Sequence, residues 1–284
     1  MAGKFILSGF SDEIDKSTDL QFQHLNKLGI SYFEPRGIDG KNISELTEQE
    51  AKDLKRKMDG YGIKASSIGS PIGKIFITDD FLTHMDKLKR VIETAKILDT
   101  EYIRMFSFFI PKGDEPEKYR TEVMERLGEM VALAEKEGVV LLHENEKEIY
   151  GDVAVRCRDI FETIQSPAFG AVFDPANFVQ CGQKVYPEAF DMLAPYIRYM
   201  HIKDAKEDGT VVPAGYGNGK VREILTELSK RNYEGFVSLE PHLGSFAGLS
   251  DLELSDNMLS LEESGPDKFK MAYQALQNIL EAIQ

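Results

Sequence analysis

The stretch Val139–Glu146 reads VVLLHENE and passes directly from four apolar residues to a His and two carboxylates. A short, uninterrupted apolar run of this kind is typical of a buried strand. Charged groups at the end of such a strand lose hydration, so something in the fold must offset that loss. The stretch therefore predicts a buried strand whose end carries a polar site.

The same pattern recurs along the chain. Seven more β-rich runs occur, and several of them end in a polar cluster: KFILSGF, SYFEPRG, KASSIGS, EYIRMFSFF, FGAVFDPANF, YMHIKDA and GFVSLEPHL. Amphipathic segments separate them, such as Leu46–Gly62, which has a capping-box spacing at Thr47 and Glu50 and ends on glycine. Eight such units with short connections predict one domain over residues 1–284, a single α/β (β/α)8 TIM barrel. In this architecture the active site lies at the C-terminal ends of the strands.

Composition narrows the class of partner. Of the 284 residues, 42% are hydrophobic and 29% charged, and 34 basic residues against 48 acidic ones give a formal net charge of −14. A nucleic-acid-binding surface is normally basic, so we expect a small-molecule partner and no nucleic acid. No apolar run approaches the roughly 20 residues that span a bilayer, and the start of the chain does not resemble a signal peptide. We therefore expect a cytoplasmic protein without membrane contact.

Four of the expected strand ends carry a residue that commonly binds metal ions: Glu144, Asp174, His201 and Glu240. Side chains alternate faces along a strand, so Glu144 points into the barrel if Leu142 does. His143 then faces the helix layer or the rim. The four residues follow consecutive strands and are expected to meet over the barrel mouth. Three carboxylates in one place repel one another unless a cation intervenes, and this ligand set suits Mn²⁺, Mg²⁺ or Co²⁺.

Five segments carry a resemblance to a known family: LLHENE, FDPANF, YMHIKDA, PAGYGNGKV and SLEPH. With them the sequence resembles the xylose isomerase-like TIM-barrel superfamily, the sugar phosphate isomerase/epimerase group. The resemblance implies one divalent metal ion, Mn²⁺ first and Mg²⁺, Co²⁺ or Zn²⁺ as alternatives, on Glu144, Asp174, His201 and Glu240. It also implies that Glu144 and Glu240 act as catalytic acid and base. One departure is Gly215-Tyr216-Gly217, where relatives commonly have Gly-Glu-Gly.

The chemistry that follows is proton transfer on a small ketose or sugar derivative through a metal-bound cis-enediolate. Returning the proton on the opposite face epimerises the substrate, and returning it to the adjacent carbon isomerises the substrate. Expelling a β-hydroxyl instead makes the protein a dehydratase of a keto-cyclitol, which is the alternative within the enzyme class. A metal-binding but noncatalytic barrel is the alternative outside it. Histidines expected of a nuclease of this fold are missing from the ends of strands three and four.

Seven further polar residues near the strand ends are predicted to bind substrate: Glu34, Arg36, Arg104, Glu146, Asn177, Lys203 and His242. For Glu34 and Arg36 the alternative is a salt bridge to each other, and for Arg104 it is pairing with a barrel carboxylate such as Glu34. Asp204 is expected to cap or orient its neighbours. His84 lies in a helical pattern and is expected at the surface.

The segment 244–267 after the eighth strand is long for a barrel loop. We predict that it folds over the mouth of the barrel or contacts a second subunit in a homo-oligomer.

Overall fold

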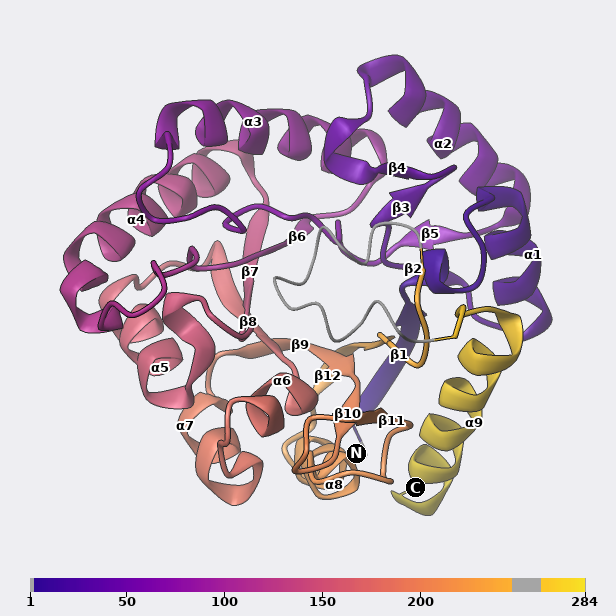
Figure 1. Cartoon of the computed structure of the whole chain (residues 1–284). Coiled ribbons are helices and arrows are strands. Elements are labelled where there is room, and N and C mark those ends of the chain that lie inside the picture. The colour runs from indigo at the N-terminus through magenta and orange to yellow at the C-terminus, as the bar shows by residue number, and fades with distance from the viewer. Residues whose placement is uncertain (1–2, 247–261, 284) are drawn as a thin grey trace.

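The computed structural model describes residues 3–246 and 262–283, and its strands form a ring inside a layer of helices (Figure 1). Six strands form one parallel sheet in the order β1-β12-β9-β8-β7-β6. Their bounds are β1 Lys4–Gly9, β6 Tyr102–Met105, β7 Val140–Glu144, β8 Phe169–Phe173, β9 Ile197–Ile202 and β12 Glu234–Leu239. Residues 247–261 of the predicted insertion lie outside the described residues, so its role stays a prediction.

Two short strands close the sheet into a barrel. They are β2 (Tyr32–Phe33) and β5 (Lys64–Ala65), which pair in parallel with each other. On one side the backbone N–H of Glu34 donates to the carbonyl of Gly9 at 2.9 Å, which joins β2 to β1. On the other side Ile68 forms a parallel bridge with Ile103 of β6. The described residues therefore contain a ring of eight parallel strands, which confirms the predicted (β/α)8 barrel.

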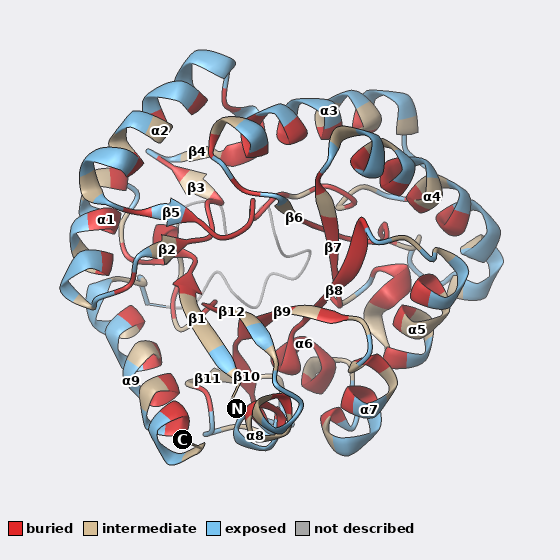
Figure 2. Cartoon of the chain, turned by 180° about the vertical axis from the view of Figure 1, so that it is seen from behind, coloured by how far each residue is buried: buried red, intermediate tan, exposed pale blue. Residues whose placement is uncertain are grey.

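The helices cover the outside of the ring, with buried inner faces and exposed outer faces (Figure 2). They are α1 Thr18–Lys27, α2 Glu48–Tyr61, α3 Phe81–Ile97, α4 Arg120–Glu137, α5 Ala154–Thr163, α6 Pro175–Gln180, α7 Phe190–Leu193, α8 Val221–Lys230 and α9 Pro266–Ile283. Two antiparallel hairpins lie outside the ring, β3 (Gly37–Ile38) with β4 (Lys41–Asn42) and β10 (Asp204–Ala205) with β11 (Val211–Val212). Among the described helices, none has the length and apolarity needed to cross a membrane.

The predicted ends of α2 are confirmed. The Thr47 hydroxyl accepts from the Glu50 backbone N–H, and the Glu50 carboxylate accepts from the Thr47 N–H at 2.7 Å, which completes the capping box. Gly62 ends the helix with φ of 69°, a left-handed conformation that glycine adopts without a steric penalty. Helix α2 therefore begins and ends where local side-chain chemistry favours it.

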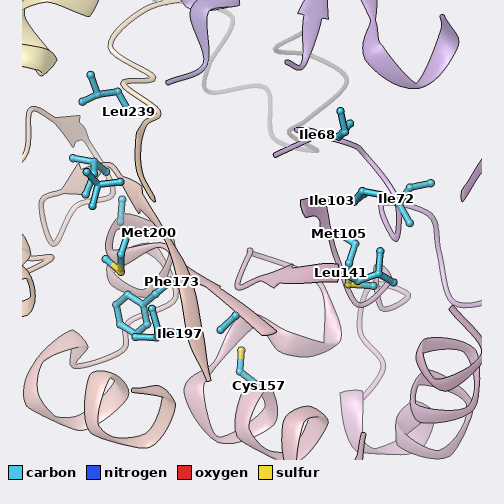
Figure 3. Close-up of a cluster of buried hydrophobic side chains, with 14 of the residues drawn as sticks. Ile68, Ile72, Ile103, Met105, Leu141, Cys157, Phe173, Ile197, Met200 and Leu239 are labelled. Carbon is cyan, nitrogen blue, oxygen red and sulfur yellow. The ribbon is translucent and has the colours of Figure 1, made fainter. Parts of the chain in front are cut away.

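Residues on β7 alternate between two apolar layers. Leu141 packs in the large core between strands and helices, together with Ile103 and Phe173 (Figure 3). Leu142 packs inside the barrel against Val172 and Tyr199. Because side chains alternate along a strand, the interior position of Leu142 directs Glu144 to the interior as well.

His143 points the other way, as expected. Its Nε2 lies 2.9 Å from the Ser107 hydroxyl, and its ring meets Phe161 of α5 edge-on at 6.0 Å. The most conspicuous residue of the opening stretch therefore belongs to the layer between sheet and helices.

The expectation that His84 lies at the surface was wrong. His84 is buried on α3, and its Nε2 accepts a hydrogen bond of 2.7 Å from the backbone N–H of Gly73. Gly73 has φ of 87°, and a Cβ at this position would collide with the carbonyl of Phe106. The loop after β5 thus passes very close to the end of β6, and His84 fixes it there.

The buried position of His84 predicts a pH-dependent contribution to stability. Burial lowers its pKa from about 6.5 to about 4. The unfolded chain therefore binds the proton first as pH falls, and the free energy of unfolding decreases between about pH 6.5 and 4. Gln cannot titrate but can still accept from Gly73. We expect His84→Gln to flatten this decrease by up to about 1.4 kcal/mol per pH unit in urea denaturation. Equal slopes for the two proteins would contradict the prediction.

Candidate metal centre

Four buried side chains from the ends of neighbouring strands converge inside the barrel mouth. Glu144 is the last residue of β7, Asp174 follows β8, His201 lies on β9 and Glu240 follows β12. One potential ligand atom from each lies within 4.8 Å of the others, and all four residues are at most 2% exposed. The strands β7, β8, β9 and β12 are adjacent in the sheet, which is why residues far apart in sequence meet here.

His201 lies at the centre of the group. Its Nδ1 is 3.0 Å from Oε1 of Glu144 and 3.5 Å from Oε2 of Glu240. Its Nε2 is 3.3 Å from Oε2 of Glu34 on the opposite side of the ring. Burial alone would lower the pKa of His201, but the carboxylates of Glu144 and Glu34 raise it well above its usual value. The ring is therefore held between acids on both sides.

Basic side chains offset part of the negative charge. Lys203 Nζ lies 3.0 Å from Oδ2 of Asp174 and 3.1 Å from Oε2 of Glu240. Arg104 Nη1 lies 3.2 Å from Oε2 of Glu144 and 3.5 Å from Oε1 of Glu240. Burial raises the pKa of Asp174 to about 7, with Lys203 opposing the rise and Glu144 adding to it. Even with these cations nearby, ionising the Asp174 carboxyl group therefore costs free energy.

The residues present fit a divalent metal ion. Three carboxylates and one imidazole offer a mostly hard ligand set of the kind that Mn²⁺, Mg²⁺, Co²⁺ and Zn²⁺ accept. Asp174 Oδ2 is buried and accepts no hydrogen bond of good geometry from the described residues, although Lys203 Nζ is at 3.0 Å. A cation bound by this oxygen would satisfy it and reduce the repulsion among the acids.

Several of the predicted substrate residues touch the four central residues. Arg104 pairs with barrel carboxylates, and those at salt-bridge distance are Glu144 and Glu240. Asn177 Nδ2 donates to Oε1 of Glu144 at 3.3 Å. Lys203 contacts Asp174 and Glu240. These residues form one continuous polar cluster with the candidate metal ligands.

The other predicted residues lie around this cluster. Arg36 Nη1 is 3.1 Å from Oε1 of Glu240 and 3.3 Å from Nε2 of His242. Glu146 lies near Lys74, with 3.3 Å between Oε2 and Nζ. The ring of His201 lies between Glu34 and the carboxylates of Glu144 and Glu240.

Two acids that the sequence interpretation missed hold Arg36. Asp12 accepts from the Arg36 guanidinium at 2.8 and 3.0 Å, and Glu13 accepts at 3.2 Å. Glu13 also accepts from the backbone N–H of His242 at 2.7 Å. Burial raises the pKa of Glu13 to about 8, with Arg36 opposing the rise. The signal was present in GFSDEID, where an apolar run ends in acids as it does in VVLLHENE.

Asp204 organises the loop beside the site, as expected. Its carboxylate accepts from the backbone N–H groups of Gly215, Gly217 and Gly219 at 2.8 to 3.0 Å. A Cβ on Gly217 would collide with this carboxylate, and a Cβ on Gly219 would lie 2.9 Å from the Cβ of Pro175. The glycines therefore let the loop pack closely on the strand end that presents Asp174. Tyr216, in the position of the family's Glu, is exposed.

Comparison with known proteins points to one family. Residues 22–261 match the family described as xylose isomerase-like TIM barrel. Fructoselysine 3-epimerase of Shigella flexneri is 25% identical over 162 residues, which is 55% of this chain and 58% of that protein. The chain thus spans somewhat more than half the length of this curated relative.

Solved structures agree on the fold. The IOLI protein with a bound zinc atom superposes with a TM-score of 0.76 at 17% identity, covering 100% of this chain and 99% of that one. The probable 3-DHS dehydratase AsbF of Bacillus anthracis superposes with a TM-score of 0.71 at 18% identity, covering 97% and 99% of the two chains.

The four-residue cluster predicts stabilisation by a divalent ion. A ligand that binds the folded chain at 100 times its Kd adds about 2.7 kcal/mol to the free energy of unfolding. We expect Mn²⁺ or Zn²⁺ to raise the thermal midpoint of the wild type, and Asp174→Asn to lose most of the rise because it removes one ligand charge. Asp152→Asn is the matched control, since Asp152 pairs with Arg156 outside the cluster. An unchanged midpoint in the wild type would contradict the metal centre.

Proposed function

Because this chain belongs to the xylose isomerase-like TIM-barrel family, we propose that it is a divalent-metal-dependent isomerase or epimerase of a small ketose or sugar derivative. The observation that carries the proposal is the cluster of Glu144, Asp174, His201 and Glu240 at one end of the barrel. We assign the metal ion to these four residues, with Mn²⁺ as the first choice. A bound divalent ion would supply Lewis-acid polarisation of the substrate carbonyl.

We assign the proton transfer to Glu144 and Glu240. One carboxylate removes the proton from the carbon beside the carbonyl, and the other returns a proton from the opposite face. Burial alone would raise the pKa of Glu240, but Lys203 and the neighbouring histidines lower it well below its usual range. Glu240 is therefore ionised, which is the form that a general base requires, although the lowered pKa also weakens it as a proton acceptor. Arg104 contacts both glutamates through one nitrogen and so fixes their relative position.

The polar residues around the cluster are proposed to bind the substrate hydroxyls. Arg36, Arg104, Lys203 and the Asn177 amide are buried donors at the barrel mouth. Glu146 and His242 border the same cluster and complete the set. Buried donors fixed by protein partners orient a sugar precisely enough for a proton to leave and return at one carbon.

A dehydratase of a keto-cyclitol is the second candidate, and the structural likeness to the probable dehydratase AsbF is the observation that favours it. Removal of the same proton is followed in that case by loss of a β-hydroxyl, with one glutamic acid protonating the leaving oxygen. The four central residues would be the same, so the product decides between the two reactions. The net charge of −14 supports a small molecule over a nucleic acid as the partner in either case.

Deuterium exchange tests the proposal. In D₂O with saturating Mn²⁺, the wild type should incorporate deuterium at the carbon beside the carbonyl of its ketose or keto-cyclitol substrate. Glu144→Gln and Glu240→Gln should each slow interconversion by about 10²- to 10⁴-fold. Each variant should still exchange the proton of one epimer only, the one whose proton faces the glutamate that remains.

This pattern separates loss of an acid or base from loss of the metal ion. Asp174→Asn is the matched control, because it removes a ligand but neither glutamate, and it should slow exchange of both epimers equally. Exchange of both epimers at the wild-type rate in the two glutamate variants would contradict the acid and base assignment. A product that has lost water would establish the dehydratase in place of the epimerase.

A further inference from the structure

We propose that Glu34 is a positioning residue for His201: it holds the imidazole so that Nδ1 faces the candidate metal ligands. The inference rests on the metal centre of the proposed function, although not on the reaction. It gives Glu34 a different role from the substrate contact that the sequence suggested.

The first observation is the orientation of the His201 ring. Nδ1 lies 3.0 Å from Oε1 of Glu144, whereas Nε2 lies 3.3 Å from Oε2 of Glu34. A neutral imidazole has one N–H and one lone pair, and a metal ion requires the lone pair. The 3.3 Å between Nε2 and Oε2 is an ion-pair distance, and Nε2 makes no hydrogen bond of good geometry to the described residues. Nδ1 must give up its proton to bind a cation in the cluster, and the negative charge of Glu34 then favours the remaining proton on Nε2. The position of Glu34 therefore favours the tautomer that can bind a metal ion at the cluster.

The second observation is that Glu34 is itself held in place. The Tyr199 hydroxyl donates to Oε2 of Glu34 at 2.9 Å. The Ser66 hydroxyl lies 2.8 Å from the Tyr199 hydroxyl, and the Ser8 hydroxyl lies 2.6 Å from that of Ser66. This interior chain of Ser8, Ser66, Tyr199, Glu34 and His201 crosses the barrel from β1 to β9, and each member is at most 1% exposed.

The third observation concerns the strand positions of these residues. Tyr199 precedes His201 by two residues on β9, so both side chains point into the barrel. Glu34 directly follows β2, whose backbone is joined to β1 by the hydrogen bond from Glu34 N–H to Gly9. The support for His201 thus lies on strands or directly beyond their ends. Such a support holds a ligand more accurately than a loop does.

A substrate contact fits these observations less well. The His201 ring stands between Glu34 and the carboxylates of Glu144 and Glu240. Tyr199 and His201 both approach Oε2 of Glu34, whereas Oε1 is buried and has no hydrogen-bond partner among the described residues. Removing a carboxylate that contacts the second ring nitrogen of a metal-binding histidine typically weakens metal binding about 10- to 100-fold.

The test measures metal affinity, not activity. Zn²⁺ or Co²⁺ is titrated into the wild type, Glu34→Gln and Tyr199→Phe by calorimetry, with circular dichroism to verify folding. Glu34→Gln should weaken binding by about 10- to 100-fold. Tyr199→Phe leaves the carboxylate in place but removes one of its anchors, so its loss should be smaller. Tyr102→Phe is the matched control: its ring packs in the same interior layer, 6.4 Å from that of Tyr199, and its affinity should be unchanged.

A second readout follows the proton on the ring. In the Zn²⁺-loaded wild type labelled with ¹⁵N-histidine, NMR should show the His201 proton on Nε2 and the metal ion on Nδ1. In Glu34→Gln, the ¹⁵N signal of Nε2 should shift, or Nε2 should bind the metal ion in place of Nδ1. A loss of packing alone would lower the thermal midpoint but would leave this signature unchanged.

The outcomes separate the two proposals. A wild type that binds no divalent ion would overturn the metal centre and the role of Glu34 with it. A wild type that binds zinc, combined with a Glu34→Gln variant of equal affinity and unchanged ¹⁵N signals, would overturn the role of Glu34 alone. A loss of metal affinity in Tyr102→Phe as large as in Tyr199→Phe would also overturn the role of Glu34. The effect could then not be assigned to the hydroxyl that is bonded to Glu34.

Discussion

Burying Glu144, Asp174 and Glu240 within a few ångströms of one another is the constraint on which the rest of the structure depends. An unpaired buried carboxylate costs several kcal/mol, and neighbouring carboxylates add repulsion to that cost. The barrel meets this cost with Lys203 and Arg104, each of which contacts two of the acids. A divalent ion would complete the compensation, so the electrostatics of the fold support the proposed metal centre as well as the ligand types do.

The loops at the mouth can be understood as supports for these charged groups. Asp204 binds three glycine N–H groups and so holds the loop that packs on Pro175, next to Asp174. On the other side of the barrel, His84 holds Gly73 against the end of β6, which carries Arg104 near its end. Both arrangements use a polar side chain to satisfy the backbone where a regular strand has stopped. Both arrangements require glycines, because a Cβ at these positions would collide with the neighbouring chain.

Period-two alternation explains how much of the site could be predicted from the sequence. Leu142 and Glu144 share a face on a regular strand, so the interior position of Glu144 follows from its spacing. Asp12 and Glu13 could not be placed in this way, because they lie in a 3₁₀ turn after β1, where alternation no longer applies. His84 was misplaced because helical spacing shows which face it occupies but not that a strand-connecting loop covers that face. Glu34 was placed correctly at a strand end, and only its partners, His201 and Tyr199, depended on the three-dimensional structure.

The interior chain beneath the site also shows how stability and function are coupled in this barrel. Barrel interiors of this architecture are usually filled with branched apolar side chains. Here Ser8, Ser66 and Tyr199 occupy interior positions and form hydrogen bonds to one another. Apolar residues of similar volume could fill the same space without requiring hydrogen-bond partners, and such replacements are often neutral or stabilising. Retaining polar groups is therefore explained better by what they hold than by packing, and the group at the end of the chain is the imidazole that faces the carboxylates. This buried chain of hydrogen bonds is in this sense an extension of the candidate metal centre.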